Sequence, residues 1–291
     1  MIYLLFSVLA STAIFVIFKL FGRFKINILH AIVVNYLMAC VSGFIAFDRP
    51  LNLAEMPGYD WFYYALGLGA LFIIVFVLMA LTTQRSGLSV VSVATKMSLI
   101  IPIIFGLLYY QEALGILKLI GILLALIAVY LASVKEHAGI AIQKNAFVLP
   151  LLVFLGSGII DTSIKFLEDA FVAENDVPLF SSTIFGAAAI IGIGTLVVHV
   201  IQGKFKFQFK NVLAGIALGI PNYFSIFFLV KALRSGILDS SGIFTINNVL
   251  IVIVSTIMGI LLFKERLGRK NWLGIDLAVF SLFFFALAQI A

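Results

Sequence analysis

The chain has 291 residues, of which 63% are hydrophobic and only 11% are charged, and its mean hydropathy is +1.21. So large an apolar excess excludes an ordinary water-soluble domain. A single cysteine, Cys40, excludes a disulfide framework and a cysteine-based metal site. The net charge of +6 is spread over short loops. It therefore indicates cationic loops at a membrane surface, and no nucleic-acid partner is expected.

Apolar runs of about twenty residues recur along the chain, and each is long enough to cross a hydrocarbon core as a helix. Short loops separate the runs, and residues 134–145 link the two halves. No loop is long enough to form a soluble catalytic domain. The runs predict ten membrane-spanning helices, at residues 2–21, 27–47, 61–83, 88–110, 115–133, 146–167, 178–201, 211–233, 237–263 and 271–290.

The two halves of the chain repeat each other. The stretch QEALGILKLIGI at residues 111–122 returns as KERLGRKNWLGI at residues 264–275, and Arg-Ser-Gly at residues 85–87 returns at residues 234–236. Repetition at a period of half the chain indicates a duplicated unit. The identical residues of the longer repeat are Glu112, Leu114, Gly115, Gly121 and Ile122 in the first copy and Glu265, Leu267, Gly268, Gly274 and Ile275 in the second.

An odd number of spans in each half inverts the second half relative to the first. With five helices per half, the second half enters the membrane from the opposite side, so a pseudo-two-fold axis in the membrane plane relates the halves. Such repeats allow two shapes of similar energy, one open to each side, which is the basis of alternating access. We predict an all-α integral membrane protein with ten transmembrane helices, built as two inverted five-helix repeats at residues 1–134 and 145–291.

The ten predicted helices and the repeated pattern E-x-L-G … G-I resemble the drug/metabolite transporter superfamily, in particular its EamA-like branch of bacterial exporters. In that branch a glutamate ends the fourth helix of each half and a glycine-containing fifth helix follows. A lysine near the end of the first helix of each half is also typical. The matching residues here are Glu112 with Gly121, Glu265 with Gly274, and the lysines Lys19 and Lys165.

The resemblance implies a central substrate cavity lined by the first four helices of each half, with the fifth and tenth helices peripheral. It also implies a small organic substrate (an amino acid, a nucleoside, another metabolite or a drug), a multi-pass place in the bacterial inner membrane, and no cofactor. Members of the family have both termini in the cytoplasm. The positive-inside rule, with five cations on the side of the termini and thirteen on the other, places both termini outside. The sequence leaves the orientation open.

Lys96 is the sharpest candidate for a substrate-binding group, because it lies deep in the fourth predicted helix. An ionisable group at membrane depth is costly and is a functional candidate by default. Pro102, further along the helix, has no N–H and frees a backbone carbonyl one turn back, near Ser98. A cationic amine beside a weakened helix would suit a carboxylate or other polar substrate group. The alternative is that Lys96 pairs with an internal carboxylate and only holds the helices together.

Asp161 lies in the sixth predicted helix, with Lys165 one turn further on the same face. One interpretation is a local ion pair near the helix end. The other is that Asp161 serves as a proton site or as a partner for Lys96. Lys19 and Lys165 are expected to extend to the membrane interface, and Glu265 is expected to bind nearby backbone or basic groups.

Neutral polar side chains inside the predicted spans complete the candidate site. Pro221 interrupts the eighth predicted helix and exposes backbone next to polar residues, and such discontinuous helices mark binding sites in transporters. The alternative for these side chains is interhelical hydrogen bonding. The predicted substrate-binding residues are Lys96, Asn35, Tyr36, Asn222, Tyr223, Asn247 and Asn248. Close helix contact or bending is predicted at Gly67, Gly69, Gly215 and Gly219.

These features favour a secondary transporter, with a carrier of lipid-linked or amphipathic substrates as the alternative. An integral-membrane enzyme would need a catalytic cluster, and the dispersed histidines His30, His137 and His199 do not form one. A channel would need a continuous polar pore, whereas the deep polar groups form a compact set. No nucleotide-binding motif is present, so ATP is not the direct energy source. A monomer is expected, because the duplicated chain already contains a two-fold arrangement.

Overall fold

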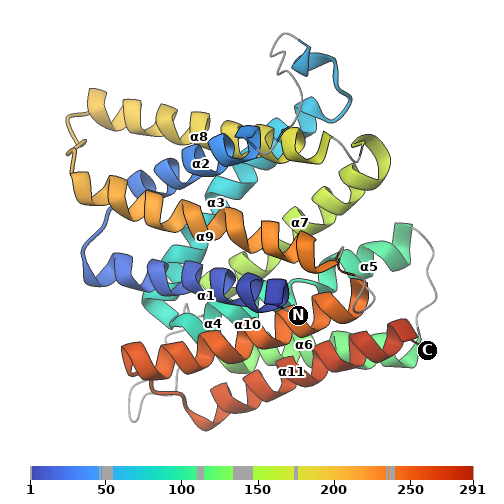
Figure 1. Ribbon diagram of the computed structural model, residues 1–291. Helices are drawn as coiled ribbons and strands as arrows, with labels where there is room; N and C mark the ends of the chain where they lie inside the picture. Colours follow the sequence, from blue (N-terminus) through green and yellow to red (C-terminus); the bar gives the residue numbers. More distant parts are fainter. Residues whose placement is uncertain are drawn as a thin grey trace.

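The computed structural model describes residues 2–45, 47, 55–109, 115–133, 147–173, 176–233, 235 and 240–290. The side chains of residues 107, 118, 133, 165, 168, 169, 230, 233, 240–245, 289 and 290 lie outside this description. Glu112, Asp239 and the side chain of Lys165 therefore fall outside the described residues. Throughout the described ranges the regular secondary structure is helical (Figure 1).

The helices are α1 (Ile2–Arg23), α2 (Ile28–Ile45), η1 (Met56–Gly58), α3 (Phe62–Ser86), α4 (Leu88–Met97), α5 (Ile100–Tyr109), α6 (Ile116–Ser133), α7 (Val148–Phe171), α8 (Val177–Ile201), α9 (Phe209–Leu233), α10 (Ser240–Phe263) and α11 (Arg269–Ile290). Eight helical segments are long and apolar enough to cross a membrane, one of them being α4 and α5 taken together. Shorter apolar segments lie in α6 and α7. The ten predicted spans are thereby confirmed, although α7 continues to Phe171, beyond the predicted end at residue 167.

The fourth span is broken between α4 and α5, as the position of Pro102 predicts. Proline cannot donate to the carbonyl four residues earlier, which belongs to Ser98. The Ile101 N–H donates to that carbonyl instead, at 2.9 Å, in a tighter turn. Lys96 therefore stands in the last turn of α4, directly before the break.

The predicted interruption at Pro221 was wrong. Helix α9 runs through this proline without a break from Phe209 to Leu233. Membrane helices tolerate proline where neighbouring helices support the segment. Helix α9 packs against both α1 and α2, and these contacts hold it helical.

The packing of the two halves repeats, as expected of inverted repeats. Helix α2 packs on α9 as α8 packs on α3, and α1 packs on α10 as α7 packs on α4 and α5. Helices α6 and α11 pack on each other at one side of the bundle, and α2 lies beside α8 (Figure 1). Both chain termini lie at the same end of the bundle (Figure 1), and the opposite end is called the far end below.

Small residues let the paired helices approach closely. A Cβ atom built on Gly69 would lie 2.6 Å from the Ala187 Cβ and 2.7 Å from the Ile184 carbonyl oxygen of α8. On Gly215 it would lie 2.5 Å from the Ala31 carbonyl oxygen of α2. The predicted close contacts are confirmed there and at Gly219. Gly67 is different, because a Cβ there would meet nothing within 4 Å.

We expect Gly69→Ala to destabilise the fold by about 1–3 kcal/mol, because the added methyl group meets backbone that cannot move aside. The measurement is the thermal unfolding midpoint of the purified protein in detergent. Gly67→Ala is the matched control on the same helix and should leave the midpoint unchanged or slightly raised. Equal midpoints for the two variants would contradict the close packing of α3 on α8.

Candidate functional site

Lys96 and Asp161 face each other across the contact between α4 and α7. Lys96 is half-buried in the last turn of α4, and Asp161 lies near the middle of α7. The two charges interact electrostatically across this contact. The hydroxyl of Ser98 at the helix break donates to the Thr95 carbonyl oxygen at 2.6 Å. A cation, a carboxylate and a broken helix therefore meet at mid-membrane depth.

The Asp161 residue is exposed, although it lies on the side of α7 that faces the other helices of the bundle. The lipid-facing side of this helix is marked by Leu152, Leu155 and Ile159, each more than 40% exposed. At about 100° per residue, Asp161 projects to the opposite side, among positions that are otherwise buried, such as Phe154 and Ser157. Asp161 therefore lies on the face of α7 that packs toward α4 and α5.

A second polar contact joins α2 to α9. The Asn222 side-chain N–H donates to the Asn35 Oδ1 at 3.2 Å, and both residues are no more than 5% exposed. Tyr36 is fully buried, and its hydroxyl donates to the Phe72 carbonyl oxygen of α3 at 2.8 Å. Tyr223 is half-buried, with its ring stacked on that of Phe227. The structure thus brings Asn35 and Asn222 together and directs the Tyr36 hydroxyl away to α3.

Several buried polar atoms have no hydrogen-bond partner among the described residues. Side-chain polar atoms in a folded interior are normally paired, so each exception calls for a ligand, a water molecule or another conformation. Those inside the spans are Thr12 Oγ1 in α1, Asn35 Nδ2 in α2, and Asn247 Oδ1 and Thr256 Oγ1 in α10. Asn248, beside Asn247, is buried as well.

The internal repeat places unpaired polar groups of the second half at positions that correspond to Lys96 in the first half. Counted from the two repeated motifs, the counterpart of Lys96 falls between Thr245 and Val249 of α10. Asn247 and Asn248 therefore stand in the second half where Lys96 stands in the first. Since α1 packs on α10 as α7 packs on α4, the charged residues of one half correspond to neutral polar residues in the other.

Sequence reasoning missed the hydroxyl groups of the site, namely Ser98, Thr12 and Thr256. Its criteria favoured charges and amides, whereas isolated serine and threonine residues are common in membrane helices because they can bond to their own backbone. The only available signal was that Thr12 and Thr256 lie well inside apolar runs.

An ion pair at the far end joins several helices around Glu265. The Lys19 Nζ lies 3.2 Å from the Glu265 Oε1, and the two side chains are only 23% and 10% exposed. The Leu88 N–H at the start of α4 donates to the same oxygen at 2.8 Å, and the Ser89 hydroxyl donates to the Oε2 at 3.4 Å. Lys19 also donates to the Thr83 carbonyl oxygen near the end of α3, at 3.2 Å.

Glycines make room for this carboxylate. A Cβ on Gly87 would lie 2.7 Å from the Glu265 Oε1, and one on Gly259 would lie 2.5 Å from the Oε2. Gly87 also has a positive φ of 110°, which glycine adopts readily. Glu265 binds both backbone and a basic group, as expected. Lys19 does not extend to the interface, because this buried partner draws it inward.

The described residues contain no group of three or more His, Cys, Asp or Glu side chains that could hold a metal ion.

Three comparisons bear on the fold and the family. Residues 1–134 match the model of the EamA-like transporter family. The chain is 29% identical over 290 residues to an uncharacterized protein of Haemophilus influenzae, with 96% of each chain covered. It is also similar in fold to a solved crystal structure, with a TM-score of 0.55 and 14% identity over 97% of this chain and 98% of that chain.

The family match agrees with the duplicated sequence, the apolar spans and the repeated helix packing. The chain is a multi-pass membrane protein whose first half is similar to the EamA-like transporter family.

Proposed function

We propose that the protein is a secondary transporter that carries a small organic metabolite across the bacterial inner membrane by alternating access. The observation that carries this proposal is the Lys96–Asp161 pair, which lies at a break in a membrane-spanning helix with its carboxylate accessible on the inner face. Charged groups at this depth are costly, and transporters place them on substrate and proton routes.

The paired charges favour a zwitterionic substrate such as an amino acid. The Lys96 ammonium would bind the substrate carboxylate, and the Asp161 carboxylate would bind its amino group. Because the two protein charges are of opposite sign, a substrate with both charges can bind each of them without leaving a buried charge unpaired. A nucleoside or a neutral drug offers no such pair of charges.

The unpaired amide and hydroxyl groups would bind the remaining polar atoms of the substrate. Asn35 Nδ2 offers a free donor, and Asn247 Oδ1 offers a free acceptor. They belong to different halves of the chain, so a substrate that touches both would be held at the interface of the repeats. Asn222, Tyr223 and Asn248 lie on the same helices and complete the proposed lining.

The Glu265 cluster supports alternating access, because it closes the far end. One carboxylate holds the end of α1 through Lys19, the end of α3 through the lysine's bond to Thr83, and the start of α4 through its N–H groups. Opening toward this side requires the Lys19–Glu265 contact to separate. We propose that this ion pair is the closed gate of the far end and that the site opens toward the termini.

Counterflow in proteoliposomes tests the proposed site, with a panel of labelled amino acids and nucleosides. We expect saturable counterflow of an amino acid, which Lys96→Met abolishes. Asp161→Asn should weaken counterflow, because the amide lacks the charge that binds the substrate amino group, and it should abolish accumulation driven by a pH gradient. Lys231→Met, which removes an exposed lysine at the end of α9, is the control and should transport normally.

Normal transport by a folded Lys96→Met protein would refute the substrate-binding role of this lysine. Saturable uptake of a lipid-linked compound in place of amino acids would favour the alternative carrier function.

Cysteine labelling tests the gate. In a Cys40→Ser background, Ser92→Cys places a thiol in α4 at a fully buried position, one turn beyond Ser89. We expect Glu265→Gln to raise the rate at which a membrane-impermeant maleimide labels this thiol roughly tenfold, equivalent to about 1.4 kcal/mol. Arg266→Gln removes a neighbouring exposed charge and should leave the rate unchanged. An unchanged rate with Glu265→Gln would contradict the gate.

A further inference from the structure

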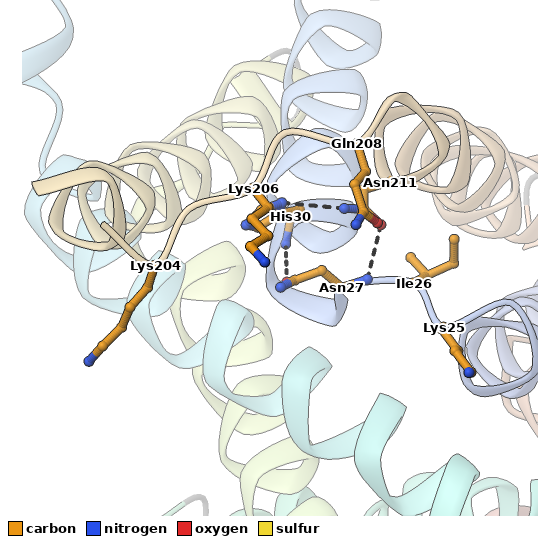
Figure 2. A pocket seen from close by; sticks show the side chains of 8 residues that line it. All are labelled: Lys25, Ile26, Asn27, His30, Lys204, Lys206, Gln208 and Asn211. Carbon is orange, nitrogen blue, oxygen red and sulfur yellow. Dashed lines mark hydrogen bonds between the residues drawn. The ribbon is translucent and has the colours of Figure 1, made fainter. Parts of the chain in front are cut away.

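A polar cavity of about 430 Å³ opens at the far end, between the α1–α2 turn and the segment that joins α8 to α9. It lies outside the proposed transport site. Figure 2 shows Lys206 beside His30, with Lys25 and Lys204 extending to either side. The lining consists of Lys25, Ile26, Asn27, His30, Lys204, Lys206, Gln208 and Asn211.

A chain of hydrogen bonds gives this cavity an ordered floor (Figure 2). The Asn27 N–H donates to the Asn211 Oδ1 at 3.0 Å, which orients that amide so that its NH₂ group faces the His30 Nδ1 at 3.4 Å. His30 therefore accepts at Nδ1 and carries its proton on Nε2. The Asn27 side chain accepts the His30 backbone N–H at 3.2 Å, and the His30 ring stacks on Phe205. The floor joins α2 of the first half to α9 of the second.

The charge of the cavity is uncompensated. Its lining includes three lysines and no acidic residue. Among the described residues, none of these lysines lies within ion-pair distance of a carboxylate, since the ion pair found there is Lys19–Glu265. Lys25 is held in a left-handed conformation, with φ of 51°, which non-glycine residues rarely adopt. Three unpaired ammonium groups around one cavity favour an anionic ligand.

The cavity lies at the level where lipid headgroups meet the acyl chains. The adjoining spans end at Arg23 and Ile201 and begin again at Ile28 and Phe209. Exposed phenylalanine side chains alternate with the lysines along the α8–α9 segment, and aromatic side chains are favoured at this membrane level. Phe24, Phe207 and Phe209 are 60%, 70% and 64% exposed.

We propose that this cavity binds the phosphate headgroup of an anionic phospholipid. The lysine ammonium groups would contact the phosphate oxygens, and the Gln208 amide would donate to the headgroup. The exposed phenylalanines would pack against the upper acyl chains. Basic pockets between membrane helices commonly take such headgroups. A free phosphate would satisfy the lysines but leave the phenylalanines without a partner, so the lipid is the better match.

The test compares the purified full chain in phosphatidylcholine nanodiscs with and without phosphatidylglycerol, by retained lipid and by thermal unfolding midpoint. We expect phosphatidylglycerol to be enriched and to raise the midpoint. The triple variant Lys25→Gln/Lys204→Gln/Lys206→Gln should lower the apparent affinity about a hundredfold, since each lysine near a headgroup contributes about a factor of five. Lys206→Gln alone should show a smaller loss, and Lys206→Arg should restore binding.

The matched control removes the same number of charges from the α10–α11 turn at the same end of the bundle, as Lys264→Gln/Arg266→Gln/Arg269→Gln. Lys264 shares the left-handed backbone of Lys25, with φ of 53°. This control should retain phosphatidylglycerol. Equal losses in the two triple variants, or no preference of the unaltered protein, would overturn the proposal. So would an equal rise in the midpoint when inorganic phosphate is added to phosphatidylcholine nanodiscs, because the site would then take free phosphate.

Discussion

The absence of water from the hydrocarbon core governs this structure. Each backbone polar group there must be satisfied within the protein, so the spans are helices that bond to themselves. Pro102 removes one helical hydrogen bond in the fourth span, and the chain compensates by the tighter turn at Ser98. The ionised groups at mid-membrane, Lys96 and Asp161, gather at this same turn. The helix break and the two ionisable side chains therefore lie at the same place in the bundle.

The two halves share a packing scheme but differ in chemistry. Helix α10 corresponds to α4 and α5, yet Ser255 stands where the first half has Pro102, and α10 is continuous there. The Ser255 hydroxyl bonds to the Val252 carbonyl oxygen within its own helix. Asn247 and Asn248 replace the cation of the first half. The repeat thus supplies a symmetric frame, and the polar residues inside the spans differ between the two halves.

The two ends of the bundle depend on different kinds of contact. At the far end, Glu265 bonds to a lysine, to a helix N-terminus and to a serine, with glycines on two sides that leave room for it. Along the helices, contact between the halves rests on small residues such as Gly69 and Gly215. Close-packed glycine contacts hold the paired helices at a fixed separation, whereas an ion pair at a helix end can separate when solvent reaches it. This difference agrees with the proposed alternating access.

The sequence by itself determined the spans and their inverted duplication, because apolar length and internal repetition are local properties that survive without coordinates. It also placed the break near Ser98, since a proline acts on its own helix. Which side chains meet was decided by the tertiary structure. The pairing of Lys96 with Asp161, the inward turn of Lys19 to Glu265 and the use of the Tyr36 hydroxyl by α3 all depend on contacts between distant segments. The sequence also predicted an interruption of α9 at Pro221, because the packing of α1 and α2 against this helix cannot be read from the sequence. The residues that a helix face contacts depend on how all the helices of the bundle pack together, and the sequence of one helix does not specify them.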